Sequence, residues 1–157
     1  MTVADRLIFL DTNILLTATT PSRKAHESAL EVLGRWPEQG AKLCLSGQVK
    51  REYLVVATRP TAHNGLGLTL PQALDNIEAI MVRCRLLEET KAVAQRLKAL
   101  ALQTKTSGKQ LHDANLVATA LVHGVTVILT ENAEDFERFS GLIEILSLNE
   151  AGSIPKS

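Results

Sequence analysis

The feature that most constrains the fold of this chain is a repeated alternation between short apolar runs and longer segments with helical periodicity. The first run, Leu7–Leu10, consists of four apolar residues and ends at Asp11. A continuous apolar run of this length is typical of a strand that is buried on both faces of a parallel sheet. Further strands are predicted at Lys42–Leu45, Arg83–Leu87, Val125–Leu129 and Ile143–Leu146.

The segments between these strands carry apolar residues at spacings of three and four, which predicts helices. Val49, Tyr53 and Val56 follow this spacing in the segment from Ser46 to Thr58. Further helices are predicted directly after Asp11, at residues 24–36, 71–82 and 89–102, before Gly124, and from residue 133. Strands that alternate with helices indicate an α/β fold, with a mostly parallel central sheet of four to five strands and helices on both faces.

Proline and glycine predict where two of these segments end. Pro37 and Gly40 are expected to end the helix that begins near residue 24. The segment Arg59–Leu70 carries proline, asparagine and two glycines, so it is predicted to be a loop. Long loops of this kind often carry contacts to a partner or a substrate.

Length and composition limit the class of protein. The 157 residues, 45% of them hydrophobic, fit one domain over residues 1–150, followed by a flexible tail at 151–157. No apolar run approaches the ~18 residues of a membrane-spanning helix, and the N-terminus lacks signal-peptide architecture. Cys44 and Cys84 lie in apolar segments without CxxC spacing, as expected for free thiols of a cytoplasmic protein.

The charge balance restricts how this chain could bind nucleic acid. It has 17 lysines and arginines against 17 aspartates and glutamates, so its net charge is zero. A strongly basic protein that coats nucleic acid through bulk charge is therefore excluded. Any nucleic acid must be bound at a local site.

Four acidic residues lie where the predicted fold would bring them to one edge of the sheet. Ligands of an open parallel sheet bind beyond the carboxyl ends of its strands. Asp11 and Asp135 follow the first and fourth strands, Asp113 begins the helix before the fourth, and Glu52 borders the buried face of its helix. Four carboxylates in one region repel one another unless a cation neutralises them, and such oxygen ligands suit Mg²⁺ or Mn²⁺.

Each of these acids also has a purely structural explanation. Asp11 could cap the next helix, Asp113 and Asp135 could complement helix dipoles, and Glu52 could be a solvated charge. Their joint position at the strand ends favours a shared site. Zinc is not favoured because His112 has no second histidine at metal-ligand spacing. The glycines form neither a GxGxxG nor a Walker pattern, so no nucleotide-binding loop is predicted.

Four short motifs follow one another along the chain: Ile8–Asn13 (IFLDTN), Val49–Glu52 (VKRE), His112–Ala120 (HDANLVATA) and Thr130–Phe136 (TENAEDF). Together they resemble PIN-domain ribonucleases, and most closely the VapC-type toxins of toxin–antitoxin pairs. The resemblance implies a PIN-like three-layer sandwich with four catalytic acids, Asp11, Glu52, Asp113 and Asp135. It implies that Asp11, Asp113 and Asp135 bind Mg²⁺ or Mn²⁺, and that the supporting pocket residues are Thr12, Asn13, Thr130 and Asn132.

The same resemblance implies an activity and partners. The activity would be endoribonuclease cleavage by water that a carboxylate-bound metal ion activates, and the partners would be a VapB-type antitoxin and a second copy of the chain. Because sequence-specific RNA recognition usually targets single-stranded loops, a structured RNA such as transfer RNA is a candidate substrate. The basic residues that could steer phosphate are Arg23, Lys24, Lys50, Arg51, Arg59, Lys105 and Lys109.

The sequence leaves several alternatives open. Glu131 and Glu134 compete with Asp135 as the acid after the fourth strand. A non-catalytic PIN-like module that binds RNA or protein is the alternative function, although four retained carboxylates argue against it. A phosphatase of the haloacid dehalogenase type would need a second acid where Asn13 stands. An antitoxin helix would be expected to dock on apolar anchors, for which Leu33, Trp36 and Tyr53 are candidates unless they belong to the core.

Overall fold

The predicted strands form one parallel sheet with the first strand at its centre. In the computed structural model, which describes residues 3–148, the strands are β1 (Leu7–Leu10), β2 (Lys42–Ser46), β3 (Cys84–Leu87), β4 (Val127–Thr130) and β5 (Glu144–Ser147). Their order across the sheet is β3-β2-β1-β4-β5, and every neighbouring pair is parallel. The predicted sheet is therefore confirmed. The predicted tail at residues 151–157 lies outside the described residues.

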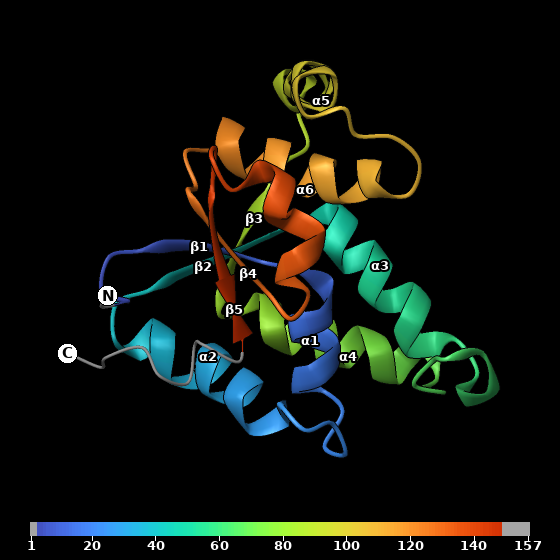
Figure 1. Cartoon of the computed structure of the whole chain (residues 1–157). Coiled ribbons are helices and arrows are strands. Elements are labelled where there is room, and N and C mark those ends of the chain that lie inside the picture. The colour runs from blue at the N-terminus through green and yellow to red at the C-terminus, as the bar shows by residue number, and fades with distance from the viewer. Residues whose placement is uncertain (1–2, 149–157) are drawn as a thin grey trace.

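Helices cover both faces of this sheet. The α-helices of the described residues are α1 (Thr12–Ala18), α2 (His26–Glu38), α3 (Gly47–Thr58), α4 (Leu70–Met81), α5 (Lys91–Thr104) and α6 (Gln110–Val122). Two 3-10 helices, η1 (Thr61–His63) and η2 (Ala133–Phe139), occur between them. Figure 1 shows α1, α2 and α4 on one side of the sheet and α5 and α6 on the other. The predicted three-layer sandwich is confirmed.

Several element boundaries differ from the predictions by a few residues. Helix α2 includes Pro37 and ends at Glu38, so the prediction that Pro37 ends this helix is wrong. Pro37 lacks an N–H, but it lies in the last turn of α2, so this loss weakens only that turn. The chain then turns away from the helix at Gly40, whose φ is +99°. Strand β4 begins at Val127 because the N–H of Val125 still donates to a carbonyl at the end of α6.

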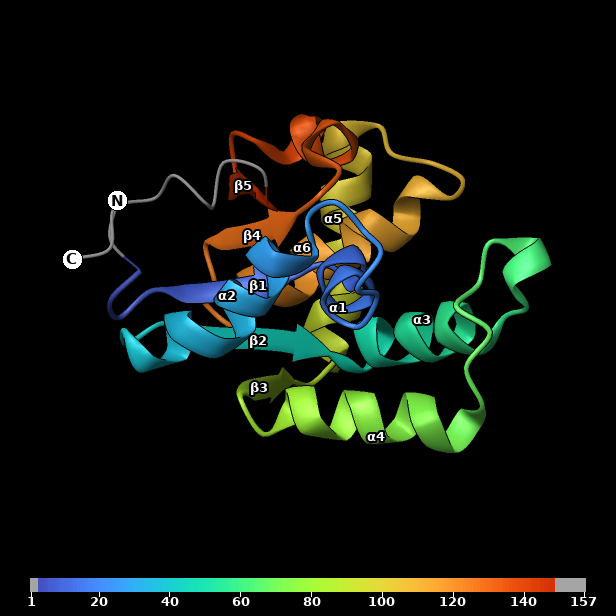
Figure 2. The same cartoon turned by 90° about the horizontal axis from the view of Figure 1, so that it is seen from below.

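Helices α3 and α4 extend past the carboxyl edge of the sheet and form an arm beside it (Figure 2). The Arg59–Leu70 segment, predicted to be a loop, closes the end of this arm. The N–H of Gly67 donates to the Arg59 carbonyl at 2.9 Å. A Cβ atom at Gly65 would lie 1.9 Å from the same carbonyl oxygen, so the loop can fold back onto α3 only with glycine there.

The core includes the three residues that were candidate anchors for a partner helix. Leu33, Trp36 and Tyr53 are buried beneath the surface, so the prediction that they anchor a partner is wrong. Apolar residues at helical spacing can pack into the core or contact a partner helix, and the spacing does not distinguish the two. Here all three residues pack into the core. Cys44 and Cys84 are free thiols, as predicted. Within residues 3–148, no helix is both long and apolar enough to cross a membrane.

Candidate active site

Asp11 lies at the carboxyl end of the central strand, where hydrogen bonds of its backbone and of its carboxylate hold it. Its backbone N–H donates to the Leu129 carbonyl at 3.0 Å. Its carboxylate accepts from the Thr12 N–H at 2.8 Å and from the Thr130 hydroxyl at 2.7 Å. The bond from Thr12 caps α1, so the structural explanation of Asp11 as a helix cap is correct too. Asp11 is only 8% exposed, and such burial of a charge is not needed for capping.

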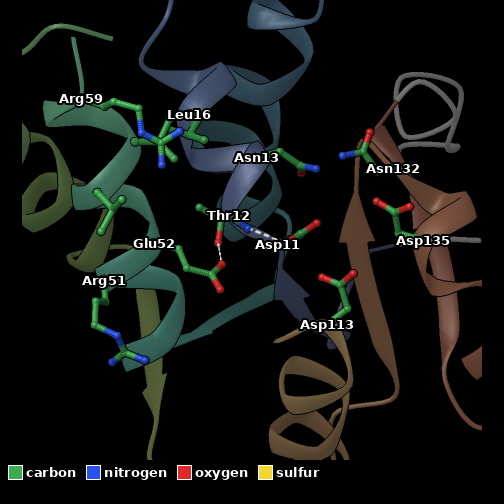
Figure 3. Close-up of a pocket in the computed structure, with 12 residues that line it drawn as sticks. Asp11, Thr12, Asn13, Leu16, Arg51, Glu52, Arg59, Asp113, Asn132 and Asp135 are labelled. Carbon is green, nitrogen blue, oxygen red and sulfur yellow. Dashed lines mark hydrogen bonds between the residues drawn. The ribbon is translucent and has the colours of Figure 1, made fainter. Parts of the chain in front are cut away.

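Four acidic side chains border one cleft of about 470 Å³. Asp11 follows β1, Glu52 lies in α3, Asp113 lies in the first turn of α6, and Asp135 lies in η2. Figure 3 shows Asp11, Asp113 and Asp135 around one space, with Glu52 on the α3 side of Asp11. The parallel sheet thus brings together four carboxylates that are far apart in the sequence, at the edge where the sequence predicted them.

Two carboxylates of the cleft, Asp11 and Asp113, have pKa values above that of an ordinary aspartate, chiefly because they are buried. Burial raises the pKa of Asp11 to about 6, although the hydrogen bonds from Thr130 and Thr12 oppose this shift. Burial also raises the pKa of Asp113 to about 7, and the negative charges of Asp11, Asp135 and Glu52 add to the effect. Carboxylates with pKa values raised in this way are typical of sites where charge is concentrated for a function.

We expect the metal-free protein to lose stability as the pH rises from about 4 to about 7, between the ordinary pKa of an aspartate and the raised values of Asp11 and Asp113. A carboxyl group whose pKa is raised by folding binds its proton more tightly in the folded state, so the free energy of unfolding falls as that proton is lost. This loss is complete above pH 6 for Asp11 and above pH 7 for Asp113, the values to which their pKa values are raised. Thermal midpoints measured in EDTA should therefore fall by several degrees over this range.

A matched pair of variants tests the origin of this pH dependence. In Asp113→Asn the fall of the thermal midpoint should be clearly smaller, because one of the two shifted groups is gone. In Asp75→Asn, which removes an exposed carboxylate on α4, the fall should equal that of the wild type. An equal fall in all three proteins would show that the cleft carboxylates do not control the stability.

The carboxylates of the cleft fit a divalent cation. In the described part of the chain, none of the four forms an ion pair with a basic side chain. Within that part, no three Asp, Glu, His or Cys side chains lie close enough to enclose a metal ion by themselves. Mg²⁺ commonly binds through one or two carboxylates and keeps several waters, so it does not need such an enclosure. Asp11, Asp113 and Asp135 are the candidate ligands.

The predicted supporting residues link the strands and helices around the acids. Thr130 is fully buried, and its hydroxyl accepts from the N–H of Asn132 at 3.0 Å and from Nδ2 of Asn13 at 3.5 Å. The hydroxyl of Thr12 donates to Oε2 of Glu52 at 2.7 Å. All four supporting residues thus hold hydrogen bonds at the carboxyl edge of the sheet.

The three acids that follow β4 occupy different surroundings. The Oε2 atom of Glu131 accepts a hydrogen bond of 2.9 Å from the hydroxyl of Thr17, at the end of α1. Glu134 is exposed and borders a neighbouring surface pocket, which meets the cleft at Asn132 and Asp135. Of the three, Asp135 alone borders the cleft. Its position therefore favours Asp135 as the fourth acid.

The remainder of the cleft follows α3. Leu16, Val55 and Val56 form an apolar wall. Arg51 lies on α3 beside this wall, and Arg59 is the residue that directly follows α3 (Figure 3). The other basic residues that were predicted to steer phosphate do not border the cleft. One end of the cleft is therefore acidic, and the other combines apolar and basic side chains.

Three polar residues outside the predicted set contact the site from behind Glu52. Gln48 donates to Oε1 of Glu52 at 2.8 Å, and Asn115 donates to Oε1 of Gln48 at 2.6 Å and to Oε1 of Glu89 at 2.7 Å. The spacing of four residues between Gln48 and Glu52 on one helix was a signal for the first contact. The other two contacts depend on the tertiary fold, and no sequence pattern indicates them.

Solved structures with this fold align with most of the chain. VapBC2 from Rickettsia felis bound to a promoter DNA fragment is 16% identical, with a TM-score of 0.66, covering 90% of this chain and 98% of that chain. A toxin–antitoxin complex from Klebsiella pneumoniae is 23% identical, with a TM-score of 0.61, covering 90% and 97%. VapC20 from Mycobacterium tuberculosis, a sarcin–ricin loop cleaving toxin, is 14% identical, with a TM-score of 0.61, covering 87% and 95%.

These likenesses establish the fold. No match to the sequence is found among curated proteins. The profile of the PIN domain, however, matches residues 8–142. This range begins in β1, ends just before β5 and contains all four acids of the cleft. Because the match covers most of its length, the chain belongs to the PIN domain family.

Proposed function

We propose that this chain is an endoribonuclease that depends on Mg²⁺ or Mn²⁺. The observation that carries this proposal is the arrangement of Asp11, Glu52, Asp113 and Asp135 around one cleft, with no ion pair to a basic side chain among the described residues. Such unneutralised carboxylates are costly unless they serve to bind a cation. Membership of the PIN domain family supports the same conclusion.

In this proposal the residues of the cleft have different roles in catalysis. A bound Mg²⁺ or Mn²⁺ supplies an acidified water and neutralises charge on the scissile phosphodiester. Asp11, Asp113 and Asp135 hold the ion, and the hydrogen bond from Thr130 fixes the carboxylate of Asp11 for this role. Glu52 faces the same space, where it would bind a water of the ion and orient that water for attack. In-line attack leaves a 3′-hydroxyl and a 5′-phosphate.

The two arginines beside the cleft suit the substrate. Arg51 on α3 and Arg59 directly after it border the cleft on the side away from Asp135 (Figure 3). Guanidinium groups bind phosphate through pairs of hydrogen bonds, so these residues would hold the backbone on one side of the scissile bond. The apolar wall between them would contact bases or riboses. Single-stranded RNA in a structured loop fits this combination.

Purified protein incubated with RNA tests this proposal. Transfer RNA and a sarcin–ricin loop oligonucleotide are suitable substrates, the latter because VapC20, which has a similar fold, cleaves that loop. We expect cleavage in Mg²⁺ or Mn²⁺, no cleavage in EDTA, and recovery when the metal is restored in excess. Cleavage that resists EDTA would contradict the metal dependence. Binding of both RNAs without cleavage would favour the alternative, a non-catalytic PIN-like module.

We further propose that the chain acts as a toxin held inactive by a VapB-type antitoxin. Solved structures with this fold include several toxin–antitoxin complexes. The cleft offers carboxylates beside the apolar wall of Leu16, Val55 and Val56, which suits a partner segment with basic and apolar side chains. The same proposal includes a cytoplasmic location and a homodimer. Light scattering would measure the oligomeric state.

A further inference from the structure

A chain of hydrogen-bonded amides lies behind Glu52, outside the cleft itself. Its central member is Gln48, in the first turn of α3 and only 2% exposed. The Nε2 group of Gln48 donates to Oε1 of Glu52 at 2.8 Å and to the His112 carbonyl at 3.0 Å. The Nδ2 group of Asn115 donates to Oε1 of Gln48 at 2.6 Å and to Oε1 of Glu89 at 2.7 Å. Both amide NH₂ groups therefore use both of their hydrogens.

This pattern fixes the orientation of each amide. Glu89 is a carboxylate and accepts only, so the NH₂ group of Asn115 must face it. Asn115 then presents a hydrogen to Gln48, which must turn its oxygen toward Asn115 and its NH₂ group toward Glu52. The reverse orientation of Gln48 would place its oxygen against the Glu52 carboxylate and the His112 carbonyl, so acceptors would face acceptors. Glu89 thus sets the orientation of Glu52 through two amides.

The same chain connects the two helices that carry acids of the cleft. Gln48 lies one turn before Glu52 on α3, and the carbonyl that it binds belongs to His112, the residue before Asp113 on α6. Few other contacts join α3 to α6, since α3 belongs to the arm that extends beyond the sheet. Gln48 is therefore the bridge that fixes the position of Glu52 relative to Asp113.

The second oxygen of Glu52 is held from the opposite side. Its Oε2 atom accepts from the hydroxyl of Thr12 at 2.7 Å. The donors on both carboxylate oxygens are neutral groups, so Glu52 is held in place while its negative charge is not cancelled by an ion pair. A carboxylate that is oriented but not neutralised is prepared for a cation or for a metal-bound water.

We propose that Gln48 and Asn115 are positioning residues, which hold the Glu52 carboxylate in the place where it acts together with Asp113 on a divalent cation. This inference rests on the proposed function, since it assumes that the cleft binds such a cation. The competing explanation is that the amides only stabilise the contact between α3 and α6. The two explanations differ in what they predict for the affinity of the metal in a folded variant.

Titration calorimetry with Mn²⁺ alone distinguishes them. Gln48→Leu and Asn115→Leu should each bind Mn²⁺ about tenfold more weakly than the wild type, as is typical when a hydrogen-bond partner of a metal-site residue is lost. Asn115→Leu keeps the size of the side chain and adds no charge, but it removes both donated hydrogen bonds, so the amide of Gln48 loses the contact that fixes its orientation toward Glu52. Circular dichroism and thermal melting confirm that each variant is folded.

Asn76→Leu is the matched control. Asn76, half-buried like Asn115, donates to the hydroxyl of Tyr53 at 3.1 Å, and it does not border the cleft. This variant should lose stability but keep the wild-type affinity for Mn²⁺. Wild-type affinity in folded Gln48→Leu and Asn115→Leu would overturn the inference and leave the proposed function intact. A wild type that binds Mn²⁺ tightly but cleaves no RNA would overturn the proposed function alone, and no Mn²⁺ binding would overturn both.

Discussion

Replacing Asp113 by asparagine is expected to lower the rate of RNA cleavage by about a thousandfold or more, the equivalent of losing ~4 kcal/mol of transition-state stabilisation. The amide keeps the shape of the side chain but removes a negative charge from the cleft. The metal-free variant should also be more stable than the wild type at about pH 8, because burial and the charges of Asp11, Asp135 and Glu52 disfavour an ionised Asp113. Initial rates on RNA and thermal midpoints in EDTA measure the two effects.

Glu134→Gln provides the control for this comparison. Glu134 lies in η2 next to Asp135 but does not border the cleft, so the substitution should leave the cleavage rate almost unchanged. Full activity in Asp113→Asn would contradict a site that depends on shared carboxylates. An inactive Asp113→Asn that is also much less stable than the wild type would indicate that the residue acts through the fold and not through the chemistry.

Expression of the wild-type chain without its partner is expected to reduce the number of colony-forming cells by orders of magnitude. An unrestrained endoribonuclease degrades an RNA pool that every cell needs, and each enzyme molecule acts many times. Co-expression of a VapB-type protein, encoded by a neighbouring small gene, should restore growth and yield a stable complex. Plating efficiency and co-purification measure these two results.

The Asp113→Asn variant separates toxicity by cleavage from toxicity by overexpression. This variant should permit normal growth while still forming the complex, since the apolar wall of Leu16, Val55 and Val56 is unchanged. Equal toxicity of the variant would contradict a nuclease mechanism. A wild-type chain that is harmless when overexpressed and binds no partner would contradict the toxin role, although the assignment to the PIN domain family would be unaffected.

The fold was predictable because its signals are local and repeated. The run before Asp11 is buried on both faces, and the same reasoning located all five strands to within a few residues. Parallel strands share a carboxyl edge, so the closeness of Asp11 and Thr130 followed from the topology. Boundaries failed where neighbours intervene, as at Val125, whose N–H is taken by α6 and not by the sheet.

The positions of the acids were predictable as a group but not individually. No feature of the nearby sequence distinguishes Asp135 from Glu131 as the acid of the site, since both follow β4. The hydrogen bond from Thr17 to Glu131 favours Asp135 as the acid of the cleft, and it joins residues more than a hundred positions apart. The burial that raises the pKa of Asp113 also comes from the assembled fold. Tertiary contacts therefore select one acid from a cluster of candidates.

The lining of the cleft was harder to predict than its acids. Leu33 and Trp36 lie on α2 and Tyr53 lies on α3, and all three belong to the core. The apolar residues that do line the cleft include Val55, which is 52% exposed and has no sequence feature that marks it as functional. Gln48 carries a partial signal through its spacing from Glu52, but its bond to Asn115 requires the packed structure.

The most direct test of the central claim is whether the clustered carboxylates bind one divalent cation. Titration calorimetry with Mn²⁺ at about pH 7, in buffers of different ionisation enthalpy, measures both affinity and proton release. The wild type should bind Mn²⁺ and release protons, because metal ligands must be deprotonated and the pKa of Asp113 is raised to about 7. Asp113→Asn should bind at least about tenfold more weakly, a loss of ~1.4 kcal/mol, and release fewer protons. Equal affinity and equal proton release in the two proteins would contradict the claim.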